Sequence, residues 1–314
     1  MILTVTPNSA LDRILFIEEW SPGLPMRTDG YHDCIGGKGM DCSVVLTHLG
    51  VDTVGLVFEA GATGKEMLAV AERYGIETEA VRVEGETRLA LVICETEHER
   101  HSHIMAGALR VNDEHLEVLW RRFRRRVDEA DWVIGAGTLS PGCPTSFYRD
   151  LVVAAAETET PVLIDCAREP LLASLPARPA IVKMNTEEFA VTFGVRPESM
   201  EGWIGESYRI FRAHEMPALV LTIGVEGMIA FSAEGAFQVK PPPQKPVNAA
   251  GAGDAASAAL VWRLAEGDDW SAALQWAGAV SAATVLTEGT ADCHMDEIER
   301  IRGDVVVSQL NVAG

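Results

Sequence analysis

The sequence predicts an α/β fold, a three-layer α/β/α domain with a mainly parallel central sheet and a small β-sheet lid. Short β-branched runs alternate with helical stretches, which is the pattern of a parallel sheet covered by helices on both faces. The alternation breaks at residues 12–35 and 80–105, where extended segments follow one another without helices between them. We therefore predict a single domain over residues 1–314, in which these two segments build the lid.

Each predicted element has a local signature. Helices are expected over 63–74 and 113–127, with Asn112 as a cap before the second and glycines, Gly50 and Gly75, after two helices. Apolar runs bounded by turn residues predict the central strands, namely 2–5 (ILTV), 52–58 (DTVGLVF), 131–137 (DWVIGAG), 161–165 (PVLID), 180–185 (AIVKMN) and 218–224 (ALVLTIG).

The composition limits the partners that the protein can bind. The chain has 314 residues and is 47% hydrophobic, which is enough for a sizeable core. Its 46 acidic and 26 basic residues give a net charge of −20. Because nucleic acid and anionic membrane surfaces would repel such a chain, we expect neither as a partner. An anionic small molecule would need a local basic pocket.

The cellular location follows from cysteine usage and the chain start. The six cysteines are scattered without a C-x-x-C pair, which is typical of free thiols in a reducing compartment. The opening MILTVTPNSALD shows no secretory signal, and no apolar run approaches the roughly 18 residues of a membrane span. We therefore expect a cytoplasmic protein.

A glycine turn with a carboxylate is the first candidate for chemistry. Residues 247–260 read VNAAGAGDAASAAL, so Gly251, Ala252 and Gly253 precede Asp254 at the start of a helix-forming run. Backbone N–H groups of such a turn converge on an anion, and the helix N-terminus adds partial positive charge. A carboxylate on the same turn can take the proton of an attacking hydroxyl. An ordinary glycine turn is the alternative interpretation.

Two further stretches carry polar groups at turns. In CIGGKGMD, residues 34–41, paired glycines allow close backbone approach to a ligand and bring Lys38 and Asp41 to a helix start. Lys38 is followed by glycine, so this is not a Walker A motif. In VKMNTEEF, Asn185 and Glu188 share one face if the segment becomes helical, where an amide and a carboxylate can hold hydrated Mg²⁺.

These stretches, in this order, resemble the ribokinase-like carbohydrate kinases of the phosphofructokinase-B type. The resemblance covers nearly the whole chain and is closest to the 1-phosphofructokinase and tagatose-6-phosphate kinase branch. The segments that carry it are TVTPNSALD, GGKGMD, GETR at 85–88, GAGTLSPG at 135–142, KMNTEE, LTIGVEG at 221–227 and NAAGAGD.

The resemblance implies ATP-dependent transfer of a phosphoryl group to a sugar hydroxyl. Asp254 matches the family's base, and Gly251, Ala252 and Gly253 match its anion hole. ATP and Mg²⁺ are the implied cofactors, with Asn185 and Glu188 matching the residues that organise the metal. The matches on the nucleotide side are Lys183, Asn185, Thr222, Gly224 and Gly227.

On the acceptor side, members of this branch usually act on sugars that already bear one phosphate. Fructose 1-phosphate, fructose 6-phosphate and tagatose 6-phosphate are therefore the expected acceptors. Arg88, Lys38 and Arg27 are the local cations that could bind the phosphate, and an arginine can do so in a bidentate way. The positions that match sugar contacts are Asp12, Gly37, Lys38 and Asp41.

Asp41 departs from the family, which usually has asparagine there. A carboxylate near Asp12 would repel a phosphosugar; two charges about 4 Å apart interact by roughly 4 kcal/mol at an effective dielectric constant of 20. Either Lys38 neutralises Asp41, or the substrate is neutral or carries an amine. Three functions thus stay open: a sugar-phosphate kinase, a kinase for an unphosphorylated sugar or nucleoside, and a non-catalytic sugar-binding regulator.

Exposed lid strands could also pair two copies into a homodimer.

Overall fold

The centre of the protein is a ten-stranded sheet, seen in a computed structural model that describes residues 1–28, 30–98 and 100–312. The strand order is β16-β15-β14-β13-β12-β11-β10-β1-β4-β5. Seven strands are parallel: β1 (Ile2–Thr6), β4 (Thr53–Glu59), β5 (Glu77–Arg82), β10 (Trp132–Ala136), β11 (Val162–Asp165), β12 (Ile181–Asn185) and β13 (Leu219–Thr222). Three antiparallel strands extend one edge: β14 (Met228–Ser232), β15 (Gly235–Lys240) and β16 (Val306–Gln309).

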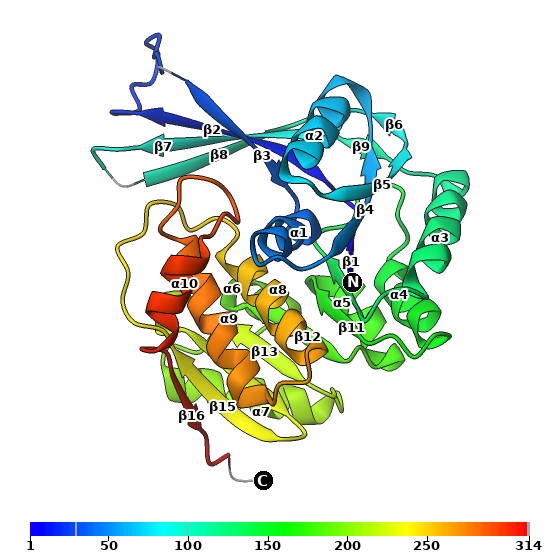
Figure 1. Ribbon diagram of the computed structural model, residues 1–314, viewed down its shortest axis with the longest axis vertical. Coiled ribbons are helices and arrows are strands. Elements are labelled where there is room, and N and C mark those ends of the chain that lie inside the picture. The colour runs from blue at the N-terminus through cyan, green and yellow to red at the C-terminus, as the bar shows by residue number, and fades with distance from the viewer. Residues whose placement is uncertain (29, 99, 313–314) are drawn as a thin grey trace.

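Helices pack on both faces of this sheet, each with its own apolar cluster, and this confirms the predicted three-layer architecture (Figure 1). One layer contains α1 (Lys38–His48), α2 (Gly61–Tyr74), α8 (Ala252–Ala265), α9 (Trp270–Thr284) and α10 (Met295–Arg302). The other contains α3 (Asp113–Val127), α4 (Phe147–Ala156), α5 (Arg168–Ser174), α6 (Thr186–Phe193) and α7 (Met200–Ala213). Among the described residues, no helix has both the length and the apolar character needed to cross a membrane.

A separate four-stranded sheet, which we call the lid sheet, projects from the top of the molecule in Figure 1. It has the order β3-β2-β7-β8, with β2 (Ala10–Ile17), β3 (Tyr31–Gly36), β7 (Arg88–Glu95) and β8 (Arg100–Ala106). The second lid segment begins at residue 88, later than the residue 80 expected from the sequence. Residues 80–82 instead belong to β5, which pairs in parallel with β4 in the central sheet. The short strands β6 (Glu84–Gly85) and β9 (Leu109–Arg110) pair with each other. In the sequence, they lie directly before β7 and directly after β8 of the lid sheet.

Local signals at the helix ends agree with the structure. Asn112 caps α3 by accepting a hydrogen bond from the backbone N–H of His115 at 3.0 Å. Gly75 ends α2 in the left-handed conformation that favours glycine, with φ of 76°. The carboxyl ends of the parallel strands meet at one edge of the sheet, which is where open α/β folds place their ligands. The starts of α1 and α8 contribute to the same region.

Candidate active site

The GAGD turn opens α8 and requires glycine at its first position. Gly251 caps the helix with φ of 81°, and a Cβ atom there would lie 2.5 Å from the backbone nitrogen of Ala291. A Cβ atom at Gly253 would lie 2.9 Å from Nζ of Lys183. The turn therefore lies directly against a buried ammonium group, which adds to the positive potential of the helix N-terminus.

Asp254 lies in the first turn of α8, and its side chain is nearly buried. The residue is 8% exposed, and its Oδ1 has no hydrogen-bond partner among the described residues. Burial raises the pKa of this carboxyl to about 7, although the charges of Lys183 and Lys38 act in the opposite direction. Asp254 thus exchanges its proton near neutral pH, as a general base should.

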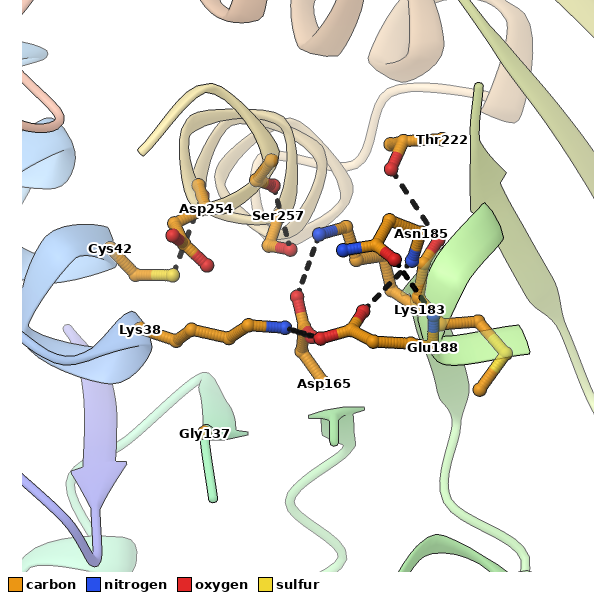
Figure 2. A network of polar contacts seen from close by, with 12 residues as sticks. Lys38, Cys42, Gly137, Asp165, Lys183, Asn185, Glu188, Thr222, Asp254 and Ser257 are labelled. Atoms are coloured by element: carbon orange, nitrogen blue, oxygen red, sulfur yellow. Dashed lines mark hydrogen bonds and ion pairs between the residues drawn. The ribbon is translucent and has the colours of Figure 1, made fainter. Parts of the chain in front are cut away.

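An ionic network lies beside Asp254 and joins four elements, α1, β11, β12 and α6 (Figure 2). Asp165, fully buried at the end of β11, accepts hydrogen bonds from Nζ of Lys38 at 2.5 Å and of Lys183 at 2.7 Å. Nζ of Lys38 also binds Oε1 of Glu188. Although burial raises it, the pKa of Asp165 is held below its usual value by the two ammonium groups.

Asn185 and Glu188 form a capping box at the start of α6. Oδ1 of Asn185 accepts from the Glu188 N–H at 2.8 Å, and Oε2 of Glu188 accepts from the Asn185 N–H at 2.9 Å. The N-x-x-E spacing thus has a local structural role. Oε1 of Glu188 and the carboxylate of Asp165 remain as hard oxygen donors, and among the described residues their partners are the ammonium groups of Lys38 and Lys183. This donor set fits Mg²⁺, which takes few protein ligands beside phosphate and water.

Asp12 and Arg88 lie at the starts of β2 and β7, where the lid sheet leaves the main body. The carboxylate of Asp12 occupies space next to Gly36, where a Cβ atom would be 2.0 Å from its Oδ1. Burial raises the pKa of Asp12 to about 7, and the charge of Arg88 lowers it in part. Nη2 of Arg88 donates to the Asn8 carbonyl at 2.7 Å, and its buried Nε has no partner among the described residues.

Gly37 and Asp41 lie at the start of α1. Gly37 is the N-cap with φ of 102°, and a Cβ atom there would lie 2.9 Å from Cγ2 of Thr6. Asp41 is buried in the first helical turn. Burial, followed by the charges of Asp254 and Asp12, raises its pKa well above the ordinary value, whereas Lys38 opposes the rise.

The remaining predicted residues lie farther from this network or outside it. Thr222 ends β13 opposite Asn185, and its hydroxyl donates to the Met184 carbonyl at 3.5 Å. Gly224 and Gly227 form the next turn, and a Cβ atom at Gly227 would lie 2.0 Å from the Val239 carbonyl oxygen. The structure does not bring Arg27 to the site. Its side chain is exposed in the loop between β2 and β3.

Sequence reasoning missed Asp165, which holds the network together. It ends the apolar run PVLID, in which Val162, Leu163 and Ile164 are buried in the sheet. An acid at the carboxyl end of a buried parallel strand is the signal that could have identified it, because ligands bind at that edge of the sheet.

The fold and the site together define an α/β kinase with a glycine turn at a helix start, a candidate base and a lid sheet. The sequence profile of the pfkB family carbohydrate kinases matches residues 9–298, so the chain belongs to this family. The ribokinase-like fold expected from the sequence is thereby confirmed, as is the expected carbohydrate kinase. Kinases of this family use ATP with Mg²⁺.

Individual relatives are similar over almost the full chain. The D-tagatose-1-phosphate kinase of Bacillus licheniformis is 26% identical over 310 residues, covering 99% of this chain and 100% of the relative. The 1-phosphofructokinase of Bacillus subtilis is 27% identical over 261 residues, covering 83% and 84%. Escherichia coli phosphofructokinase-2, solved with substrates and products, superposes with a TM-score of 0.87 at 23% identity, covering 96% of this chain and 98% of that one.

Proposed function

We propose that this protein transfers the γ-phosphoryl group of ATP to a hydroxyl of a sugar that already bears a phosphate. Fructose 1-phosphate, fructose 6-phosphate and tagatose 6-phosphate are the leading acceptors, and tagatose 1-phosphate joins them because of the Bacillus licheniformis relative. The observation that carries the proposal is the place of Asp254, a buried carboxyl with a pKa of about 7 on a glycine turn that contacts a lysine ammonium.

In the proposed reaction, Asp254 takes the proton of the acceptor hydroxyl as the hydroxyl oxygen attacks the γ-phosphorus. The bond between that phosphorus and the β–γ bridging oxygen breaks, and ADP leaves. The amides around Gly251, Ala252 and Gly253, with Lys183 behind them, stabilise the charge that develops on the transferred group. Mg²⁺, when bound, neutralises phosphate charge, and Asp165 and Glu188 are the carboxylates that would hold it together with Asn185.

On the acceptor side, we assign phosphate binding to Arg88, whose Nε is buried and free to donate within the described part of the chain. Asp12, Gly37 and Asp41 surround the acceptor, and Lys38 reaches between the acceptor and the phosphates. Lys183, Thr222, Gly224 and Gly227 line the nucleotide side. We assign no role in the site of its own subunit to Arg27, which is exposed in the loop between β2 and β3.

We also propose that two copies pair through their lid sheets. The outer strands β3 and β8 have unpaired edges, which readily pair with another chain. Large apolar side chains are exposed in this part of the protein, which supports a covered surface. They are Leu24 (66%), Met26 (39%), Tyr31 (56%), Ile104 (46%) and Met105 (58%).

A substrate panel tests the proposed activity. ADP release is measured with fructose 1-phosphate, fructose 6-phosphate, tagatose 1-phosphate, tagatose 6-phosphate, fructose, ribose and adenosine. We expect a response only from phosphorylated sugars. Turnover of a neutral sugar or of adenosine alone would favour a kinase for unphosphorylated substrates. Binding of a sugar without ADP release would favour a regulator.

A further inference from the structure

The side chain of Asp41 is buried next to the catalytic turn without a partner for one of its oxygens. The residue is 6% exposed, and its Oδ1 makes no hydrogen bond within the described residues. The thiol of the next residue, Cys42, lies 3.4 Å from the backbone oxygen of Asp254, so α1 is in contact with the start of α8 at this point. Asp41 therefore lies among the groups that serve the acceptor.

The titratable groups that face Asp41 come from α1 itself, α8, β2 and β3. Asp254 on α8 and Asp12 on β2 are carboxylates, and both repel a negative charge on Asp41. The thiols that interact with it, Cys34 on β3 and Cys42 on α1, are neutral at physiological pH because burial raises the pKa of each. Lys38 on α1 is the cation that attracts Asp41, but its Nζ lies on Asp165 and Glu188.

The three carboxyl groups of the acceptor side thus differ in their counter-charges. Asp12 has Arg88, and Asp254 has Lys183 together with Lys38. Within the described part of the chain, the cation that acts on Asp41 is Lys38, which is already held by two other carboxylates. A buried carboxylate without its own cation is costly and becomes protonated instead. The direction of the Asp41 pKa, raised by burial and by its two acidic neighbours, agrees with this ranking.

We propose that Asp41 serves the acceptor site as a neutral carboxylic acid whose O–H donates a hydrogen bond to the sugar. This role rests on the proposed function. A protonated carboxyl has one donor and one acceptor oxygen, so it offers the acceptor the same pair of functions as an amide. It also removes one negative charge from a pocket that must accept a phosphorylated sugar.

The first test needs no substrate and compares the unfolding free energy of the wild type and Asp41→Asn between pH 4 and pH 9. In the unfolded chain Asp41 loses its proton near pH 4, whereas in the folded chain it keeps it. The wild type therefore loses stability relative to the variant as pH rises. The ratio of the folding constants, variant over wild type, should grow by up to about tenfold per pH unit until Asp41 ionises in the folded state.

Asp268→Asn is the matched control, because Arg263 donates to Asp268 at 2.7 Å and holds its pKa below the usual value. The stability of that variant relative to the wild type should stay almost constant between pH 5 and 9, because Asp268 is ionised there in both the folded and the unfolded chain. The proposal is overturned if the ratio of folding constants for Asp41→Asn and the wild type stays constant with pH. It is also overturned if the wild type gains stability relative to Asp41→Asn as pH rises above 4. The infrared carbonyl band of protonated carboxyls gives a second readout: at pH 7 it should be weaker in Asp41→Asn than in the wild type, because Asp254 and Asp12 contribute to it in both proteins.

The second test follows KM for the acceptor found in the substrate panel. The ratio of the two KM values, wild type over Asp41→Asn, should rise by about tenfold per pH unit above the pH at which Asp41 ionises, because Asp12 and Asp254 titrate in both proteins and cancel in the ratio. If the wild type prefers an amino sugar and Asp41→Asn does not, Asp41 is ionised. That result would overturn the proposal. If no acceptor is phosphorylated, the proposed activity fails, and the stability test still decides the state of Asp41.

Discussion

At the scale of single residues, the site separates carboxyl groups by their counter-charges. Asp165 is bonded to two lysines and stays ionised, whereas Asp254 and Asp12 have pKa values raised by burial to about 7. Groups with opposite shifts in one site are the usual division between a structural anion and a proton acceptor. Of these three aspartates, Asp254 is the one that lies on the glycine turn, so we assign it the role of proton acceptor.

Asp254→Asn should abolish turnover while leaving acceptor binding largely intact. Loss of a general base costs about 10²- to 10⁴-fold in kcat, and the amide keeps the shape of the side chain. Steady-state ADP release and calorimetric binding of the acceptor measure the two effects. The variant should unfold at or above the wild-type temperature at pH 8, because the wild type loses stability as pH rises from about 4, where Asp254 ionises in the unfolded chain, to about 7, where it ionises in the folded chain. Near-normal kcat would refute the assigned base.

The pH dependence of kcat/KM follows from the same group. Asp254 must be ionised to accept a proton, and burial raises its pKa to about 7. Activity should therefore fall by about tenfold per pH unit below pH 7, provided that no other group titrates first. Initial rates at low acceptor concentration between pH 5 and 9 check this. A profile that is flat from pH 6 to 8 is incompatible with Asp254 as the base.

At the scale of elements, glycine turns set where the helices α1 and α8 begin. Gly37 and Gly251 both have positive φ, and both lie so close to neighbouring atoms that a side chain cannot be added. Sequence reasoning found these turns because their spacing is local. The partner of the second turn, Ala291, follows about 40 residues later, and only the fold brings the two together.

Gly251→Ala should destabilise the protein by about 1–3 kcal/mol and lower kcat, because a Cβ atom with φ of 81° is strained and meets Ala291 at 2.5–2.7 Å. Urea denaturation and ADP release measure both effects. Gly205→Ala is the control, since that glycine lies within α7 with nothing within 4 Å of the added atom. It should be neutral or stabilise by up to about 1 kcal/mol. Equal behaviour of the two variants would contradict this account of the turn.

At the scale of the whole molecule, the lid sheet leaves the main body at the starts of β2 and β7, where Asp12 and Arg88 lie. Its outer strands and loop expose the large apolar side chains described above. If a second copy covers these surfaces, the two lid sheets pack together, and this pair lies over the acceptor sites of both subunits.

Tyr31→Asp combined with Met105→Lys should convert the expected dimer to a monomer, because charges on the lid surface cannot be desolvated without partners. Size-exclusion chromatography with light scattering gives the mass of each species. Val153→Lys is the control, since Val153 is 53% exposed on α4, away from the lid sheet. A wild type that is monomeric at micromolar concentration, or a control that also dissociates, would contradict the lid interface.

The limits of sequence reasoning are visible in particular residues. Asp254, Asn185 and Lys38 lie in motifs whose spacing carries the chemistry, so their positions could be predicted. Asp165 looks like the end of an ordinary buried strand, and its two lysine partners come from other elements. The start of the lid was misplaced because β5 lies at the edge of the central sheet, where its alternating pattern matches that of a lid strand.

Lys38 is held by Asp165 and Glu188, one from β11 and one from α6, and its own backbone opens α1 next to the acceptor groups. In the proposed reaction, one ammonium group would therefore serve both the acceptor and the phosphates. A ligand that attracts Lys38 must first break an existing contact, and the carboxylate left behind then becomes available to a metal ion. In the proposed reaction, acceptor binding and metal binding would therefore be coupled through the contacts of a single side chain.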